Sequence, residues 1–201
     1  MYNRIRTLCE DKDLSQRALA GQYTMEDILL NRPNFDEDKI HEYHLSFNEA
    51  QSIDILANIY GMKGEIEKSL AMREKLIINL ERTYRAIDHT TRVMYMNQIY
   101  NQCYGLYEAK KYEACQEMAD KGLSFALGDV YAVSVYMVVM RMKAKALLRL
   151  NQKQEGDALM KRYLLYTYSM EENQDSTATF DIVKTEFQDE FGYQLDLTLP
   201  W

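Results

Sequence analysis

The stretch that decides the fold is Ile55–Ile77, ILANIYGMKGEIEKSLAMREKLI. Two small residues, Ala57 and Ser69, stand on either side of Gly64 in this stretch. Antiparallel helices approach closely only where small side chains face each other, and glycine ends a helix because it readily adopts the left-handed backbone conformation. The stretch therefore predicts a helical hairpin whose turn lies at Gly64.

The same order of small, apolar and turn residues occurs twice more. The second copy has Cys103, Leu106, Tyr107, Lys110, Cys115 and Leu123 at the corresponding places, and the third has Ala144, Leu147, Leu148, Asn151, Gly156 and Leu164. The turn residues Gly64, Lys110 and Asn151 are 46 and 41 residues apart, and asparagine often replaces glycine at such a turn. The order resembles the tetratricopeptide repeat (TPR), whose usual unit is about 34 residues, so the helices here are expected to be longer.

The composition favours helices throughout the chain. Only eight glycines and two prolines interrupt 201 residues, and strong helix formers dominate the long segments between them. The expected helices are Phe47–Met62, Glu65–Ala86, Thr90–Ala109, Lys111–Ala126, Val130–Leu150, Gln154–Tyr168 and Thr177–Phe191, preceded by Tyr2–Ala20 and Met25–Leu30. The stretch NRPNFDEDK (residues 31–39) is expected to be a break, because Pro33 disfavours helical geometry at the residue before it.

Three parts follow from this map. Residues 1–45 are expected to form an N-terminal helical cap or an incomplete repeat, residues 46–170 three long TPR-like helix pairs, and residues 171–201 a capping helix and tail. A solenoid needs such a cap because its last repeat would otherwise expose an apolar face. The predicted fold class is all-α: a TPR-like helical-hairpin solenoid, which is a right-handed α-α superhelix, with a C-terminal capping helix.

Charge and hydropathy exclude several classes of protein. A net charge of −7 argues against direct contact with nucleic acid, whose phosphates require clustered Lys and Arg. The longest apolar run, Val130–Met140, is too short to span a bilayer, and no signal peptide opens the chain. The three cysteines fit no disulfide or zinc spacing. We therefore expect a cytoplasmic protein that contacts no membrane.

Tyrosines and amide side chains gather in the stretch Met94–Cys115. On a helical wheel, one arc holds Met96, Ile99, Cys103 and Leu106, which we expect in the core. The neighbouring edge, with the matching edges of the other two hairpins, predicts a concave groove. Its candidate ligand-binding residues are Asp54, Asn58, Asn97, Tyr100, Asn101, Tyr104, Arg141, Lys145 and Arg149.

Such a groove suits an extended peptide. Amides can bond to a peptide backbone, tyrosine offers contact area with one hydrogen bond, and a basic cluster can hold a carboxylate. A purely structural role for these residues stays open, because tyrosines at this spacing often pack between helices and rows of charged residues often form solvated faces.

Catalytic chemistry is not expected from this sequence. His41 and His44 share a helical face, but no cysteine completes a metal site, so neither a metal nor a cofactor is expected.

Residues 8–28, LCEDKDLSQRALAGQYTMEDI, begin like a helix-turn-helix domain. The would-be recognition helix is acidic, however, which is the wrong charge for a DNA groove. The protein is therefore not expected to be an enzyme, nor this segment a DNA reader.

With the repeats laid out, the chain resembles a bacterial family: helix-turn-helix (XRE-type) transcriptional regulators with C-terminal TPR sensor regions, related to the Gram-positive peptide-pheromone receptors. The resemblance covers about residues 25–195. It rests on NRPNFDEDKIHEYHLSFNEAQSIDILANIYGMKGEIEKSLAMREKLI (residues 31–77), YEACQEMADKGL (112–123), KAKALLRLNQ (143–152) and VKTEFQDEFGYQLD (183–196).

The resemblance implies a sensor region that lacks the family's N-terminal DNA-binding domain. It also implies that a short peptide lies in the groove with its backbone held by asparagines, for which Asn58, Asn97 and Asn101 are the matching positions. Two alternatives remain open. The chain could be a general TPR scaffold that docks a folded protein, and it could form a homodimer, with the apolar run Val130–Met140 taking part.

Overall fold

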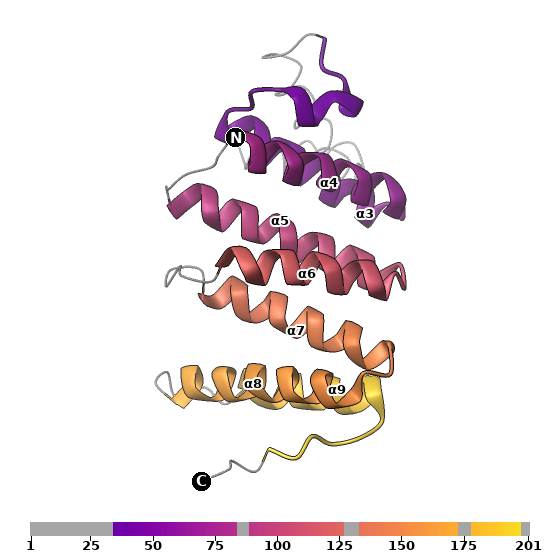
Figure 1. Cartoon of the computed structure of the whole chain (residues 1–201), viewed down its shortest axis with the longest axis vertical. Coiled ribbons are helices and arrows are strands. Elements are labelled where there is room, and N and C mark those ends of the chain that lie inside the picture. Colours follow the sequence, from indigo (N-terminus) through magenta and orange to yellow (C-terminus); the bar gives the residue numbers. More distant parts are fainter. Residues whose placement is uncertain (1–33, 84–88, 127–132, 173–177, 198–201) are drawn as a thin grey trace, which may run out of the picture. The chain divides into compact units, whose positions relative to one another are not determined.

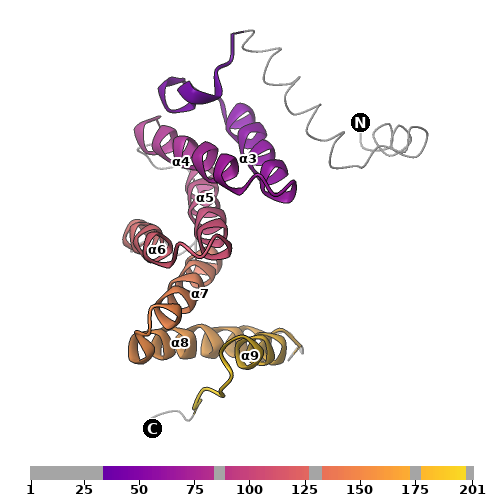
Figure 2. The same cartoon turned by 90° about the vertical axis from the view of Figure 1, so that its right-hand side faces the viewer.

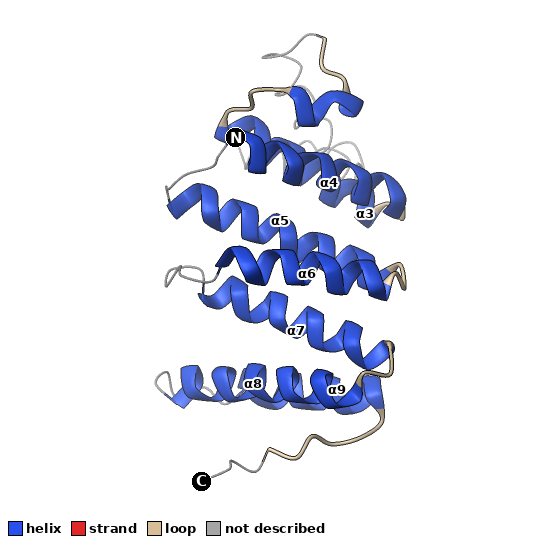
Figure 3. Cartoon of the chain, viewed as in Figure 1, coloured by secondary structure: helices blue, strands red, loops and turns tan. Residues whose placement is uncertain are grey.

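The computed structural model describes residues 34–83, 89–126, 133–172 and 178–197, so the expected helices Tyr2–Ala20 and Met25–Leu30 lie outside it. The described residues form helices and no strand (Figures 1 and 3), which confirms the all-α prediction. The elements are the 3-10 helix η1 (Glu37–Glu42) and the α-helices α3 (Phe47–Met62), α4 (Ile66–Thr83), α5 (His89–Glu108), α6 (Tyr112–Ala126), α7 (Val133–Arg149), α8 (Lys153–Glu172) and α9 (Ala178–Phe191).

The seven expected helices between residues 47 and 191 are all present, with ends that differ by at most four residues. Helix η1 is a correction, because it begins inside the stretch that was expected to be only a break. Asp36 begins it by accepting a hydrogen bond from the backbone N–H of Asp38 at 2.9 Å. Within the described ranges, no helix has the length and apolarity needed to cross a membrane.

The chain divides into two compact units, residues 1–105 and 106–201, which are described separately. In unit 1, α3 begins with a capping box: the Ser46 hydroxyl accepts from the backbone N–H of Glu49, and the Glu49 carboxylate accepts from the backbone N–H of Ser46. Helices α3 and α4 then meet at the predicted small residues, where the Ser69 hydroxyl donates to the Ala57 carbonyl at 2.7 Å.

Several side chains of α4 hold η1, and Asn79 is the buried one that bonds to its backbone; Lys75 also bonds to the Asp38 carboxylate at 2.6 Å. The buried Asn79 amide donates to the Ile40 carbonyl at 2.8 Å and to the Tyr43 carbonyl at 2.6 Å. These bonds add to those the two carbonyls already accept, a long one of 3.4 Å from the Tyr43 N–H to Ile40 and one of 3.0 Å from Arg82 to Tyr43. Ile40 is fully buried. The segment before α3 is therefore held in place by tertiary contacts.

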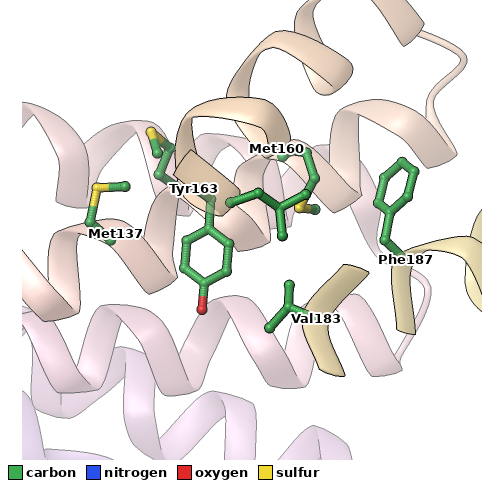
Figure 4. Packing of buried hydrophobic residues seen from close by; sticks show 8 residues of the cluster. Met137, Met160, Tyr163, Val183 and Phe187 are labelled. Carbon is green, nitrogen blue, oxygen red and sulfur yellow. The ribbon is translucent and has the colours of Figure 1, made fainter. Parts of the chain in front are cut away.

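Unit 2 is built around an apolar cluster shared by α7, α8 and α9. Its buried members are Met137, Met140, Ala144, Met160, Tyr163, Leu164, Val183 and Phe187. Figure 4 shows Met160 and Tyr163 of α8 beside Val183 of α9, and Figure 2 shows α9 running along α8. Met137, Val139 and Met140, from the apolar run, are buried, as expected of core residues.

Three hairpin turns share one backbone geometry. Gly64, Lys110 and Asn151 have φ angles of 82°, 60° and 63°, all in the left-handed region. The residue after each turn donates its backbone N–H to the carbonyl five positions earlier; these bonds are Glu65 to Tyr60, Lys111 to Leu106 and Gln152 to Leu147, each 2.9 Å long. This pattern is the Schellman motif. The predicted turn positions are therefore confirmed.

Glycine at the second turn should stabilise the protein. A non-glycine residue with a left-handed backbone costs about 1 kcal/mol, so Lys110→Gly is expected to raise the free energy of unfolding by about that amount. Gly64→Ala is the reverse control, because an added Cβ at Gly64 would meet no atom within 4 Å and would report backbone strain alone. Urea unfolding followed by circular dichroism measures both. A Lys110→Gly variant less stable than the wild type would contradict this reading of the turn.

Candidate functional site

The nine predicted ligand-binding residues are divided between the two units. Asp54, Asn58, Asn97, Tyr100, Asn101 and Tyr104 belong to unit 1, and Arg141, Lys145 and Arg149 belong to unit 2. One groove that runs through all nine residues stays a prediction.

In unit 2, the three basic residues of α7 that were predicted as site residues already pair with carboxylates of the same chain. The Arg141 guanidinium lies 2.7 Å from the Glu186 carboxylate. The Glu190 carboxylate pairs with the other two cations, and it lies 2.7 Å from the Lys145 ammonium and 3.1 Å from the Arg149 guanidinium. Both glutamates come from α9, one helical turn apart, so they reach cations spaced one turn apart on α7. The carboxylate expected from a ligand is supplied here by the capping helix.

A tyrosine completes the cluster around Glu190. The Tyr107 hydroxyl donates to the Glu190 carboxylate and accepts from the Arg149 Nε at 2.9 Å, while the Lys145 ammonium lies 4.7 Å from the centre of the Tyr107 ring. Burial raises the pKa of Tyr107, and the hydrogen bond to Glu190 raises it further. Burial alone would raise the pKa of Glu190, but the bonds from Lys145 and Tyr107 bring it below its ordinary 4.5.

Acid should weaken unit 2 through Glu190. A carboxyl whose pKa is lower in the folded state than in the unfolded chain contributes stability in full above its ordinary pKa, and that contribution is lost as pH falls through the folded value. We expect Glu190→Gln to cost about 1–3 kcal/mol at neutral pH, because it removes a charged hydrogen-bond partner. We also expect that cost to shrink below about pH 4.5.

Urea unfolding of the wild type and Glu190→Gln at several pH values gives this difference. Glu117→Gln is the matched control: it removes an exposed carboxylate from α6 and should change stability little at any pH. A Glu190→Gln cost that stays constant from neutral to acid pH would show that the carboxylate charge contributes nothing.

In unit 1, four residues form a polar network between α3, α4 and α5. The Arg73 guanidinium, whose residue is only 4% exposed, donates to the Asn58 side-chain oxygen at 2.8 Å. Asp54 accepts longer bonds from the Asn58 and Asn101 amides, at 3.4 and 3.5 Å. Burial lowers the pKa of Arg73, and the charge of Asp54 opposes that shift. Three predicted residues thus come together around an arginine that the sequence did not single out.

A cavity of about 300 Å³ opens beside this network, between α3 and α5. Its lining residues are Phe47, Gln51, Asp54, Val93, Met94, Asn97 and Gln98. Asp54 and Asn97 were predicted as site residues, and the other five were not. Among the described residues that line the cavity, Asp54 alone is ionisable.

Gln98 is the residue that sets this cavity apart. It is 1% exposed, and its side-chain oxygen Oε1 has no hydrogen-bond partner among the described residues. A buried acceptor without a partner costs about 1–3 kcal/mol, so one that lines a cavity is a candidate for a bond to a ligand, water or ion. The sequence offered one signal, the adjacent amides Asn97 and Gln98 between the apolar residues Met96 and Ile99.

The two candidate tyrosines lie outside the cavity lining. Tyr104 is 52% exposed and Tyr100 is half-buried. The expected core arc of the same helix is confirmed, since Met96, Ile99 and Cys103 are buried.

The chain matches no family model, no curated protein and no solved structure.

Proposed function

We propose that this chain is a TPR-like helical-repeat domain that binds a short peptide, and that the cavity of unit 1 receives part of that peptide. Three hairpin turns with the same capping bonds support the repeat assignment. The cavity size supports the ligand class. At about 300 Å³ it stands at the lower end of the range for ligand pockets, enough for one or two residues of an extended chain.

The observation that carries the proposal is the Gln98 side-chain oxygen. It is a buried acceptor without a partner among the described residues, and its residue lines a cavity together with Asn97 and Asp54. A peptide presents a backbone N–H at every residue except proline, and each is a donor of the required kind. Binding would therefore supply the bond that Gln98 lacks.

A regulatory setting accords with the resemblance to the sensor regions of helix-turn-helix regulators. In that setting the DNA would be read elsewhere than by these 201 residues, since their charge of −7 does not suit a DNA surface. The peptide would be a signal, and its binding in unit 1 the sensing event.

The test uses the full 201-residue chain and a pool of random hexapeptides labelled at the C-terminus, with fluorescence anisotropy as the readout. Gln98→Leu removes the buried acceptor at similar side-chain volume. We expect it to weaken binding at least about tenfold, since a lost hydrogen bond of about 1.4 kcal/mol has that effect. Its free energy of unfolding should stay the same or rise, because an unpartnered polar atom is removed.

Gln116→Leu on α6 is the matched control and should bind as the wild type does, because Gln116 is half-buried in the other unit. A pool that shows no binding at any accessible protein concentration would overturn the peptide proposal. It would favour the alternative of a scaffold that docks a folded protein. A Gln98→Leu variant that binds as tightly as the wild type would remove the cavity from the site.

A further inference from the structure

The charges and acceptors of the unit 1 cavity specify what it binds. We propose that the group entering this cavity is a primary ammonium, carried by the free N-terminus of the peptide or by a lysine side chain. This inference rests on the proposed function and deepens it. It also reverses the expectation drawn from the basic residues of α7, which favoured a ligand carboxylate.

The cavity offers acceptors that an ammonium can use. Asp54 supplies the one charge among the described lining residues, and its hydrogen bonds from Asn58 and Asn101 are long and come from neutral amides. Such bonds leave most of its acceptor capacity unused. The Gln98 oxygen adds a neutral acceptor. An ammonium has three donors and a positive charge, so it can satisfy both groups at once, whereas one backbone N–H can satisfy only one of them.

Arg73 is the cation whose charge acts on Asp54. It does not line the cavity, and it already donates to Asn58 at 2.8 Å. Its charge offsets part of the negative potential of Asp54. Asp54 stays the one charged residue among the described residues that line the cavity, so an entering carboxylate would meet its like charge. The Arg73 Nε has no partner among the described residues, so an anion that reaches it is the rival outcome to be tested.

The predicted anion-binding residues of α7 already have carboxylate partners. Arg141, Lys145 and Arg149 pair with the glutamates of α9 at 2.7–3.1 Å. The net charge of −7 also favours the approach of cations over anions. Phe47, Val93 and Met94 line the cavity as well, and they suit the methylene chain of a lysine or the apolar side chain of a first residue.

Four hexapeptide pools, each labelled at the C-terminus and free of arginine, distinguish the possibilities. The first has a free N-terminus and no lysine, and the second is the same pool acetylated. The third is acetylated with one lysine, and the fourth is acetylated with one glutamate. We expect the first or the third pool to bind the full chain at least about tenfold more tightly than the second and fourth. Whichever of the two binds identifies the source of the ammonium.

Asp54→Asn is the decisive variant, because it removes the charge at constant shape. We expect it to lower the affinity for the ammonium-bearing pool to that of the acetylated pool, with the folded state checked by circular dichroism. Asp189→Asn makes the same change at an exposed position of α9 and should leave the affinity unchanged.

The outcomes separate the two proposals. If the acetylated pool without lysine binds as tightly as the others and Gln98→Leu abolishes that binding, the peptide site stands and the ammonium assignment is wrong. Tightest binding by the glutamate pool would assign the site to an anion near Arg73. If none of the four pools binds, the proposed function itself fails.

Discussion

Gly156→Val should destabilise unit 2 by about 3 kcal/mol, the upper end of the usual cost of overpacking a core. Gly156 is buried in α8 where that helix meets α7. A Cβ added there would lie 2.7 Å from the Leu148 Cγ and 3.1 Å from the Ala144 carbonyl oxygen. The carbonyl belongs to the backbone of α7 and cannot turn aside, so the two helices would have to move apart.

Gly105→Ala is the control that makes this result specific. Its added Cβ would also come close to another atom, 2.9 Å from a Leu70 methyl group, but that atom ends a flexible side chain. Alanine also has a helix propensity about 1 kcal/mol better than glycine. The two variants, compared by urea unfolding, should therefore differ in stability by about 3–4 kcal/mol. Equal stabilities would mean that α7 and α8 are not in close contact at Gly156.

Asn79→Asp should destabilise unit 1 by about 3 kcal/mol, because it sets a buried carboxylate against two carbonyl oxygens and removes two hydrogen bonds. The substitution keeps the shape of the side chain but replaces the amide nitrogen with an oxygen. That oxygen would face the Ile40 and Tyr43 carbonyls, which now accept hydrogen bonds at 2.8 and 2.6 Å. Two bonds are lost and like partial charges are brought together.

The measurement is hydrogen exchange with mass spectrometry, read on the peptides that contain η1 and α4. Protection should fall in both. Asn48→Asp makes the same chemical change at an exposed position in the first turn of α3. It should leave stability unchanged or slightly raised, since negative charge is favourable at a helix N-terminus. Loss of protection confined to η1 would show that Asn79 orders the 3-10 helix without contributing to α4.

The features predicted correctly from the sequence are those that a few neighbouring residues determine. Gly64 and Asn151 are suited to a left-handed backbone, and the match of Cys103, Leu106 and Cys115 to the other two copies placed Lys110 at the second turn. Helix η1 was missed for the opposite reason. Its residues carry no strong helical signal, and the bonds from Asn79, 36 and 39 residues away, hold it in place.

The candidate site was predicted in part for the same reason. The edges of α3 and α5 indicated Asp54 and Asn97, which do line the cavity. Gln98 was passed over because it lies beside the core residue Ile99, where side chains are expected to be apolar. Arg141 was expected to meet a ligand, but it pairs with Glu186, 45 residues further along. A pattern within one helix cannot show which distant carboxylate reaches it.

The spacing of the three turns bears on how this chain tolerates insertions. Helices α4 and α5, between the first two turns, have 18 and 20 residues, and α6 and α7, between the next two, have 15 and 17. Helix α6 is thus three residues shorter than α4, and α7 is three residues shorter than α5, which is close to one helical turn. The turns have the same geometry in every copy, so the helix lengths of the two copies differ at the ends away from the turns. Segments of three or four residues added there should be accepted, whereas a single added residue would rotate a buried face towards solvent.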